Sequence, residues 1–190
     1  MEWEKRLFQF RGLLVMVPVF VAFLWPDGGR VEESVVWSVG PSVFLGAIAL
    51  RVWAQYHLGY RMPVSTRLTT SGPYRYIRNP IYVANAIMAL SVIFMMEVLW
   101  IIPLATLWCA VLYWQVVRYE ERHLLRKYGE AHRTYLAEVP RWFPWRALGC
   151  LWSALTVPSR LKLAFVAEVH CLAILLAPAL KEALKHWLHG

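Results

Sequence analysis

The sequence has few acidic residues, few cysteines and none of the short motifs that hold metals or phosphates. It carries 12 Asp and Glu residues against 20 Lys and Arg residues, and only 3 cysteines. No CxxC pair, HExxH sequence or glycine-rich phosphate loop occurs, which excludes the zinc, thioredoxin-like and P-loop sites that such motifs define. We interpret Cys109, Cys150 and Cys171 as small packing residues and His123 and His132 as solvated surface histidines, and we expect no metal site.

Apolar residues are the abundant class. They make up 59% of the chain, and the mean hydropathy is +0.44, which is more apolar than an ordinary soluble domain. A membrane-spanning helix needs about 20 mostly apolar residues, and five runs suit that role: Leu7–Trp25, Val35–Gln55, Pro80–Met96, Val98–Val117 and Leu163–Leu180. We therefore predict an all-α, polytopic integral membrane protein with about five transmembrane helices. The first run is too long for a cleavable signal peptide and has no small-residue cleavage site, so we expect it to stay as a span.

The net charge of +8 would suggest a nucleic-acid partner in a soluble protein, but here the basic residues follow the apolar runs. Lys and Arg gather before the first run, between the second and third, and between the fourth and fifth. By the positive-inside rule the N-terminus and both long polar segments are cytoplasmic, and the C-terminus is outside. We expect no nucleic-acid partner and, in a prokaryote, a place in the cytoplasmic membrane.

A polar and aromatic segment lies directly before the third apolar run. Gly72 and Pro73 indicate a turn, and Pro80 suits the first turn of a helix. Asn79 would then be the N-cap, at a helix start whose N–H groups can bind an anion. Tyrosines and arginines of this segment offer flat faces and forked donors to a charged, planar ligand: Tyr74, Arg75, Tyr76, Arg78 and Tyr82. The same composition also suits an aromatic, basic anchor at the membrane interface.

Two adjacent carboxylates, Glu120 and Glu121, follow the fourth apolar run. They can be a solvated pair that balances Arg118 and Arg122. Alternatively, they meet the Arg/Tyr segment, because both lie at the same end of the predicted hairpin of spans three and four. One site would then combine a helix N-terminus, arginines, aromatic faces and a carboxylate. That set suits a zwitterionic adenosyl cofactor.

Two ordered blocks of residues carry a resemblance to a known family. They are Gly72-Pro73-Tyr74 with Arg78-Asn79-Pro80-x-Tyr82, and Glu120-Glu121-x-x-Leu124 with Tyr128-Gly129, Tyr135 and Val139-Pro140-Arg141. Over roughly residues 55–144 the chain resembles the isoprenylcysteine carboxyl methyltransferases and the related phospholipid methyltransferases. The resemblance implies a helical membrane enzyme that uses S-adenosylmethionine, with a cytoplasmic cofactor pocket and an entrance for the acceptor on the lipid side.

The resemblance also implies which residues form the site. Its cofactor contacts fall on Thr66, Arg67, Leu68, Thr69, Tyr74, Arg78, Asn79, Pro80, Ile81, Tyr82 and Glu120. The family usually has His where this chain has Asn79. The substrate-binding Arg of the isoprenylcysteine enzymes falls on Val116, and Arg118 is the nearest replacement. With Arg118 we assign a catalytic role to Glu121; if the acceptor is an amine, Glu121 or a tyrosine would act as general base.

We therefore predict methyl transfer from S-adenosylmethionine to a lipid or prenylated acceptor, first a prenylcysteine-type carboxylate and alternatively a phospholipid amine. Two rival classes are an NADPH-dependent enzyme similar to sterol reductases and a non-enzymatic scaffold that holds membrane lipids. We divide the chain into N-terminal spans (1–56), a methyltransferase core (57–146) and a C-terminal interfacial segment with a span (147–190). In the last part, Glu168 and His170 are further candidates because ionisable residues in spans are often functional. The sequence leaves the oligomeric state open.

Overall fold

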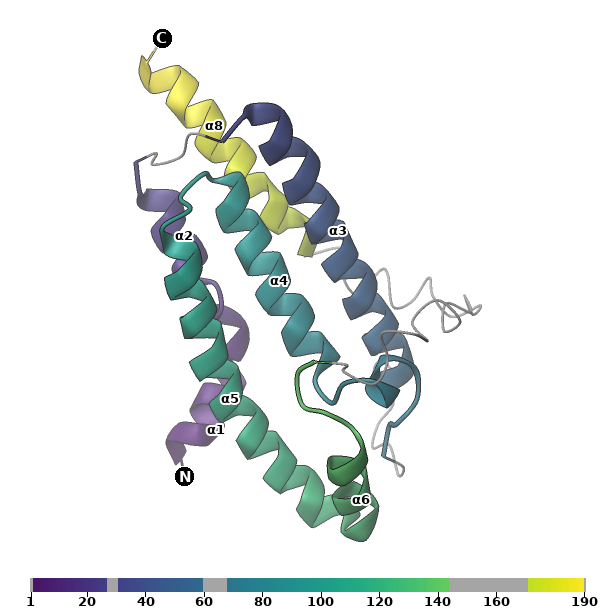
Figure 1. Cartoon of the computed structure of the whole chain (residues 1–190). Coiled ribbons are helices and arrows are strands. Elements are labelled where there is room, and N and C mark those ends of the chain that lie inside the picture. The colour runs from purple at the N-terminus through teal and green to yellow at the C-terminus, as the bar shows by residue number, and fades with distance from the viewer. Residues whose placement is uncertain (1, 27–30, 60–67, 144–170, 190) are drawn as a thin grey trace.

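The predicted all-α class is confirmed. The computed structural model describes residues 2–26, 31–59, 68–143 and 171–189, and within these ranges the chain forms helices and no strand. Figure 1 shows a long bundle in which α3 lies beside α4 and α1 lies beside α5. The elements are α1 (Glu2–Leu14), α2 (Val17–Leu24), α3 (Glu33–Leu58), the 3₁₀ turn η1 (Gly72–Arg75), α4 (Pro80–Met95), α5 (Ile101–Tyr128), α6 (Glu130–Glu138), the 3₁₀ turn η3 (Ala173–Leu175) and α8 (Leu176–His189).

In the part of the chain that the structure describes, three stretches of helix are long and apolar enough to cross a membrane: Glu2–Leu24, Glu33–Leu58 and Ile101–Tyr128. The third predicted run is the shorter apolar helix α4, which has 16 residues. The fifth, Leu163–Leu180, falls largely outside the described residues, as do Glu168 and His170, and its last part lies in η3 and α8. The first four predicted runs thus correspond to helices.

The connection between α4 and α5 is longer than the sequence predicts, because only Glu97 separates the third and fourth predicted runs. Helix α4 ends at Met95 and α5 begins at Ile101, so five residues join them. Glu97 adopts a positive φ of 58°, which is uncommon for a residue other than glycine. The backbone therefore reverses direction over these five residues. The loop includes the first three residues of the fourth predicted run, which begins at Val98.

Helices α3 and α4 form the closest helix pair of the bundle. At Gly40 of α3, an added Cβ would lie 2.3 Å from Cγ of Met95, so only glycine allows this approach. Phe44 and Val92 lie in the same core and are fully buried. Other large apolar side chains, such as Leu45 and Leu107, are more than half exposed. This outward apolar surface is what a lipid environment stabilises.

The chain turns back on itself at the end of α5, and this turn closes one end of the bundle. Gly129 has a φ of 57°, a value that favours glycine, and it separates α5 from α6. After α6 the chain returns to the start of α4, where the backbone N–H of Arg78 donates to the carbonyl of Pro140 at 3.0 Å. Figure 1 shows α6 at the opposite end of the bundle from α8.

Candidate functional site

A cavity of about 520 Å³ lies where α1, α3, α4, α5 and α6 meet. Its volume is within the range of pockets that hold small molecules and cofactors. Both sequence blocks line it, together with residues of α1, α3 and α6. The lining residues are Gln9, Arg11, Gly12, Arg51, Gln55, Leu58, Leu68, Thr69, Tyr74, Arg78, Asn79, Pro80, Ile81, Tyr82, Asn85, Glu120, Glu121, Leu124, Tyr128, His132 and Tyr135.

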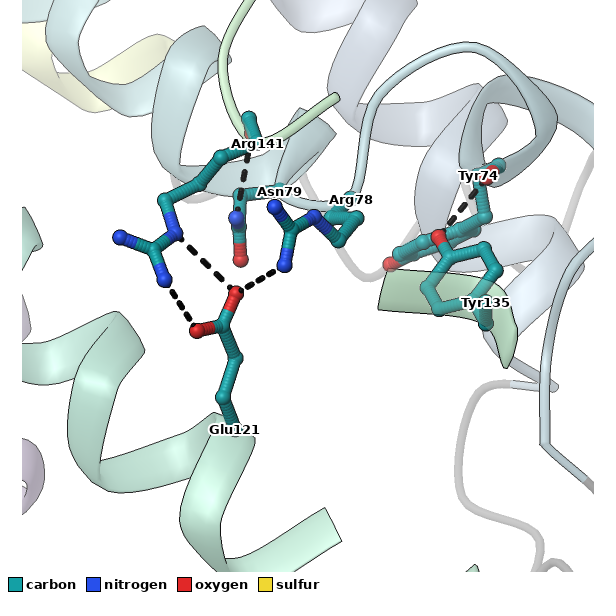
Figure 2. A network of polar contacts seen from close by, with 6 residues as sticks. All are labelled: Tyr74, Arg78, Asn79, Glu121, Tyr135 and Arg141. Atoms are coloured by element: carbon teal, nitrogen blue, oxygen red, sulfur yellow. Dashed lines mark hydrogen bonds and ion pairs between the residues drawn. The ribbon is translucent and has the colours of Figure 1, made fainter. Parts of the chain in front are cut away.

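Glu121 joins three separate segments of the chain (Figure 2). Its Oε1 accepts a hydrogen bond from Nη1 of Arg78 at 2.8 Å and from Nε of Arg141 at 3.1 Å. Its Oε2 lies 2.5 Å from Nη2 of Arg141. The guanidinium of Arg141 also lies over the ring of Trp114, 4.9 Å from its centroid. Both carboxylate oxygens are therefore held by guanidinium groups, and the general-base role of Glu121 stays a prediction.

Glu120 faces a different partner from its neighbour. Its Oε2 accepts a hydrogen bond from the hydroxyl of Tyr82 at 2.8 Å, and its Oε1 accepts none from the described residues. The ring of Tyr82 in turn lies 4.9 Å from that of Tyr113, centroid to centroid. Consecutive positions on a helix point about 100° apart, so one glutamate contacts the cavity's tyrosine while the other fixes the arginines. Glu120 is the carboxylate in this cavity that can accept a further donor.

Asn79 stands at the N-cap position of α4, but its side chain makes no capping hydrogen bond. The predicted capping role is therefore wrong. Its Nδ2 instead donates to the carbonyl of Arg141 at 3.1 Å (Figure 2). The physical reason is the return of the chain after α6, which brings a carbonyl close to a side-chain amide that is only 9% exposed. Asn79 thus connects the start of α4 to the segment that also carries the guanidinium on Glu121.

The α6 end of the cavity is aromatic. The hydroxyl of Tyr135 donates to the carbonyl of Tyr74 at 2.8 Å (Figure 2). Burial raises the pKa of both phenols, and the charge of Glu120 raises that of Tyr74 further. Both phenols therefore stay protonated and uncharged. They form a flat, neutral wall at the α6 end of the cavity.

His132 also belongs to this end, so our interpretation of it as a solvated surface histidine is wrong. It is 1% exposed, and its ring lies 6.1 Å from that of Tyr135, centroid to centroid. Burial occurs because α6 folds back toward the start of α4 rather than continuing α5. The spacing held a signal: His132 precedes Tyr135 by three positions, which places the two on one face of α6. His123, by contrast, is exposed as predicted.

Ten of the thirteen predicted site residues line this cavity, from Leu68 and Thr69 to Glu121. Thr66 and Arg67 lie outside the described residues. Arg118 is exposed and does not line the cavity; its carbonyl accepts a hydrogen bond from Nε of Arg122. Val116, where the resemblance places the substrate-binding Arg, is fully buried.

Sequence reasoning missed the cavity residues of the first half of the chain. Arg11 lines the cavity from α1, where its guanidinium lies 4.0 Å from the centroid of the Phe8 ring. Arg51 of α3 donates from Nη1 to Oδ1 of Asn85 on α4. An arginine within an apolar run is the signal that could have indicated the second of these. In the described part of the chain, no group of three or more His, Cys, Asp or Glu side chains could hold a metal ion.

Comparison with known proteins agrees with this geometry. A family model for phospholipid methyltransferases matches residues 36–131, half of the chain. The chain is 32% identical over 94 residues to the nickel-cobalt-cadmium resistance protein NccN of Alcaligenes xylosoxydans xylosoxydans, a match covering 50% of this chain and 43% of NccN. It is 33% identical over 94 residues to the cobalt-zinc-cadmium resistance protein CzcN of Cupriavidus metallidurans, a match covering 50% of this chain and 42% of CzcN. The matched segment thus spans less than half the length of either relative. On the family match, the chain belongs to the phospholipid methyltransferase family.

Proposed function

We propose that this protein is an integral membrane methyltransferase that uses S-adenosylmethionine and acts on a lipid-like acceptor. One observation carries the proposal: the two blocks of the resemblance, around residues 72–82 and 120–141, line one cavity at the end of an apolar helix bundle. Ion pairs from Glu121 to Arg78 and Arg141 hold these blocks together. The family match supports the methyltransferase reaction.

The charged groups of the cavity fit the charges of the cofactor. Glu120 has an oxygen available for the amino group, and guanidinium groups, such as that of Arg78, suit the carboxylate. The neutral wall of Tyr74 and Tyr135 suits the adenine. When bound, S-adenosylmethionine would supply an electrophilic methyl group. The residues of this chain would bind it, orient it and keep water away.

Positioning is the main contribution that this geometry can make to methyl transfer. Holding two reactants in line can supply about 7–11 kcal/mol of a reaction barrier. Tyr82 is 7% exposed and fixes one oxygen of Glu120, which limits how that carboxylate can move. Arg141 fixes Glu121 with two hydrogen bonds. The cavity is thus lined by side chains whose conformations are set by one another.

Two acceptor classes fit the cavity. A prenylcysteine-type carboxylate is ionised at neutral pH and needs a cation; Arg11 and Arg51 line the cavity and can provide one, although the family's Arg is replaced by Val116. A phospholipid amine must lose a proton first, and this proton would pass to a group other than Glu120, whose second oxygen the amino group of the cofactor would occupy. The family description, phospholipid methyltransferase, favours the second class.

A methyl-transfer screen tests the proposal. Purified protein in lipid nanodiscs would be incubated with S-adenosylmethionine labelled in its methyl group, together with phosphatidylethanolamine or a farnesylcysteine analogue. We expect label in one of these lipids and none when Glu120 is replaced by Gln. Saturable binding of NADPH would instead support the sterol-reductase class. Lipid binding with no saturable binding of the adenosyl cofactor would support the scaffold class, and either result would overturn the proposal.

A further inference from the structure

His132 is the least satisfied polar side chain of the cavity. It is 1% exposed, and neither ring nitrogen has a hydrogen-bond partner among the described residues. Leaving a buried polar atom without a partner costs about 1–3 kcal/mol. Folded proteins rarely keep such a cost unless a water molecule or a ligand relieves it. The arrangement therefore points to a partner other than the described residues.

The surroundings of His132 indicate its charge. Burial lowers its pKa, and the charge of Arg78 acts in the same direction, while Glu121 on α5 opposes them. Since Glu121 is itself paired with two arginines, its effect on the ring is weakened. The ring is therefore neutral at pH 7, and a neutral imidazole has one nitrogen that donates and one that accepts.

The cofactor has two uncharged parts, the ribose and the purine, and the purine is the flat part that suits an aromatic wall. Its amino and carboxylate groups are charged and suit Glu120 and the arginines. Its purine is neutral and flat, with an exocyclic amino donor beside ring-nitrogen acceptors. His132 lies at the end of the cavity that carries the aromatic wall of Tyr74 and Tyr135. A purine placed against this wall would bring its polar edge to the imidazole.

We propose that His132 recognises the purine of the adenosyl cofactor by a hydrogen bond that one of its ring nitrogens accepts from the exocyclic amino group of the purine. This inference rests on the proposed function, because it assigns a residue to the cofactor site of that reaction. It also explains why a polar side chain of the short helix α6 is buried although neither of its ring nitrogens is paired among the described residues. The unpaired state would then be a property of the protein without cofactor.

Replacing His132 by Phe tests the inference, because Phe keeps a planar ring and removes both nitrogens. The variant, the wild type and a His123→Phe control would be compared in detergent. Thermal unfolding without ligand would be measured, and so would the affinities for S-adenosylhomocysteine and for its inosine analogue, in which an oxygen replaces the exocyclic amino group. His123 is exposed, so its replacement should change neither quantity.

We expect His132→Phe to unfold at the same temperature as the wild type or a higher one, because an unsatisfied polar group is lost. Its affinity for S-adenosylhomocysteine should fall about tenfold, which corresponds to the loss of one hydrogen bond. The preference of the wild type for adenine over hypoxanthine should disappear. An unchanged affinity, or an equal loss for both ligands, would overturn the inference.

Two further results separate the possible failures. If the Phe variant does not fold, His132→Gln keeps a donor and an acceptor and should retain the preference for adenine. A wild type that binds both purines equally would overturn the role of His132 while leaving the proposed function intact. A wild type that binds neither ligand would overturn the proposed function itself.

Discussion

Arg141 holds Glu121 by both of its oxygens, although 20 positions separate the two residues: Nε lies 3.1 Å from Oε1 and Nη2 lies 2.5 Å from Oε2. This contact brings the segment after α6 onto α5, and Arg78 extends it to the start of α4. The cavity is bounded by these segments. Its shape therefore depends on a carboxylate that, in our account, does not touch the reacting atoms.

Replacing Glu121 by Gln should destabilise the protein and weaken cofactor binding together. The change leaves two partly buried guanidinium groups without their anion, which we expect to lower the free energy of unfolding by about 1–3 kcal/mol. Thermal unfolding in detergent would measure the loss.

The exposed pair of Arg133 and Glu130 on α6 provides the control, because both side chains are more than two-thirds exposed. Glu130→Gln should change stability by no more than about 0.5 kcal/mol. Equal effects of the two replacements would contradict the central role of Glu121.

Substitutions of Asn79 distinguish its observed contact from the role that we predicted. An N-cap tolerates Asp as well as Asn, whereas the contact to the carbonyl of Arg141 needs a donor that Asp lacks. We expect Asn79→Asp to destabilise the protein at least as much as Asn79→Ala. Asn79→His keeps a donor and should be tolerated. A stable Asp variant in thermal unfolding would restore the capping interpretation.

The stability of the protein should fall as the pH falls below 7, and His132 should account for part of this loss. Burial lowers its pKa below the ordinary value of 6.5. Between the folded and unfolded pKa values the unfolded chain binds more protons, so the free energy of unfolding decreases as the pH falls. Thermal unfolding from pH 7 to 5 should show a smaller decrease for His132→Phe than for the wild type and for His123→Phe. Superimposable curves for all three proteins would contradict a neutral, buried ring.

Topology provides a separate test of the membrane assignment. In the structure, Glu4 of α1 pairs with Arg122 near α6, whereas Lys181 of α8 contacts carbonyls of Ala22 and Met96. Figure 1 shows α6 and α8 at opposite ends of the bundle.

In a background without the native cysteines, we expect Arg133→Cys to react with an impermeant maleimide only from the cytoplasmic side. Trp187→Cys, at a side chain that is 79% exposed, should react only from outside. Labelling of both from one side would contradict a C-terminus outside the membrane.

Local patterns in the sequence predicted much of this fold and part of the site. An uninterrupted apolar run predicts a helix without any knowledge of tertiary contacts. The break between α5 and α6 follows from the preference of Gly129 for positive φ. The contact between Glu121 and Arg78 was one of two alternatives that the sequence offered, because both residues lie at the same end of the predicted hairpin of spans three and four. The roles of Asn79 and His132 could not be predicted in this way, because each depends on where the chain returns after α6. Such returns are fixed by contacts between distant segments.

Binding of the cofactor to Glu120 tests the central claim most directly. Isothermal titration of the purified protein with S-adenosylhomocysteine should give saturable binding. Glu120→Gln should weaken it by about 1.5–3 kcal/mol, the contribution of a hydrogen bond to a charged group. The variant should still fold, because the carboxylate lines an open cavity, and Glu130→Gln should bind as the wild type does. Absence of saturable binding to the wild type, or unchanged binding by Glu120→Gln, would contradict the account.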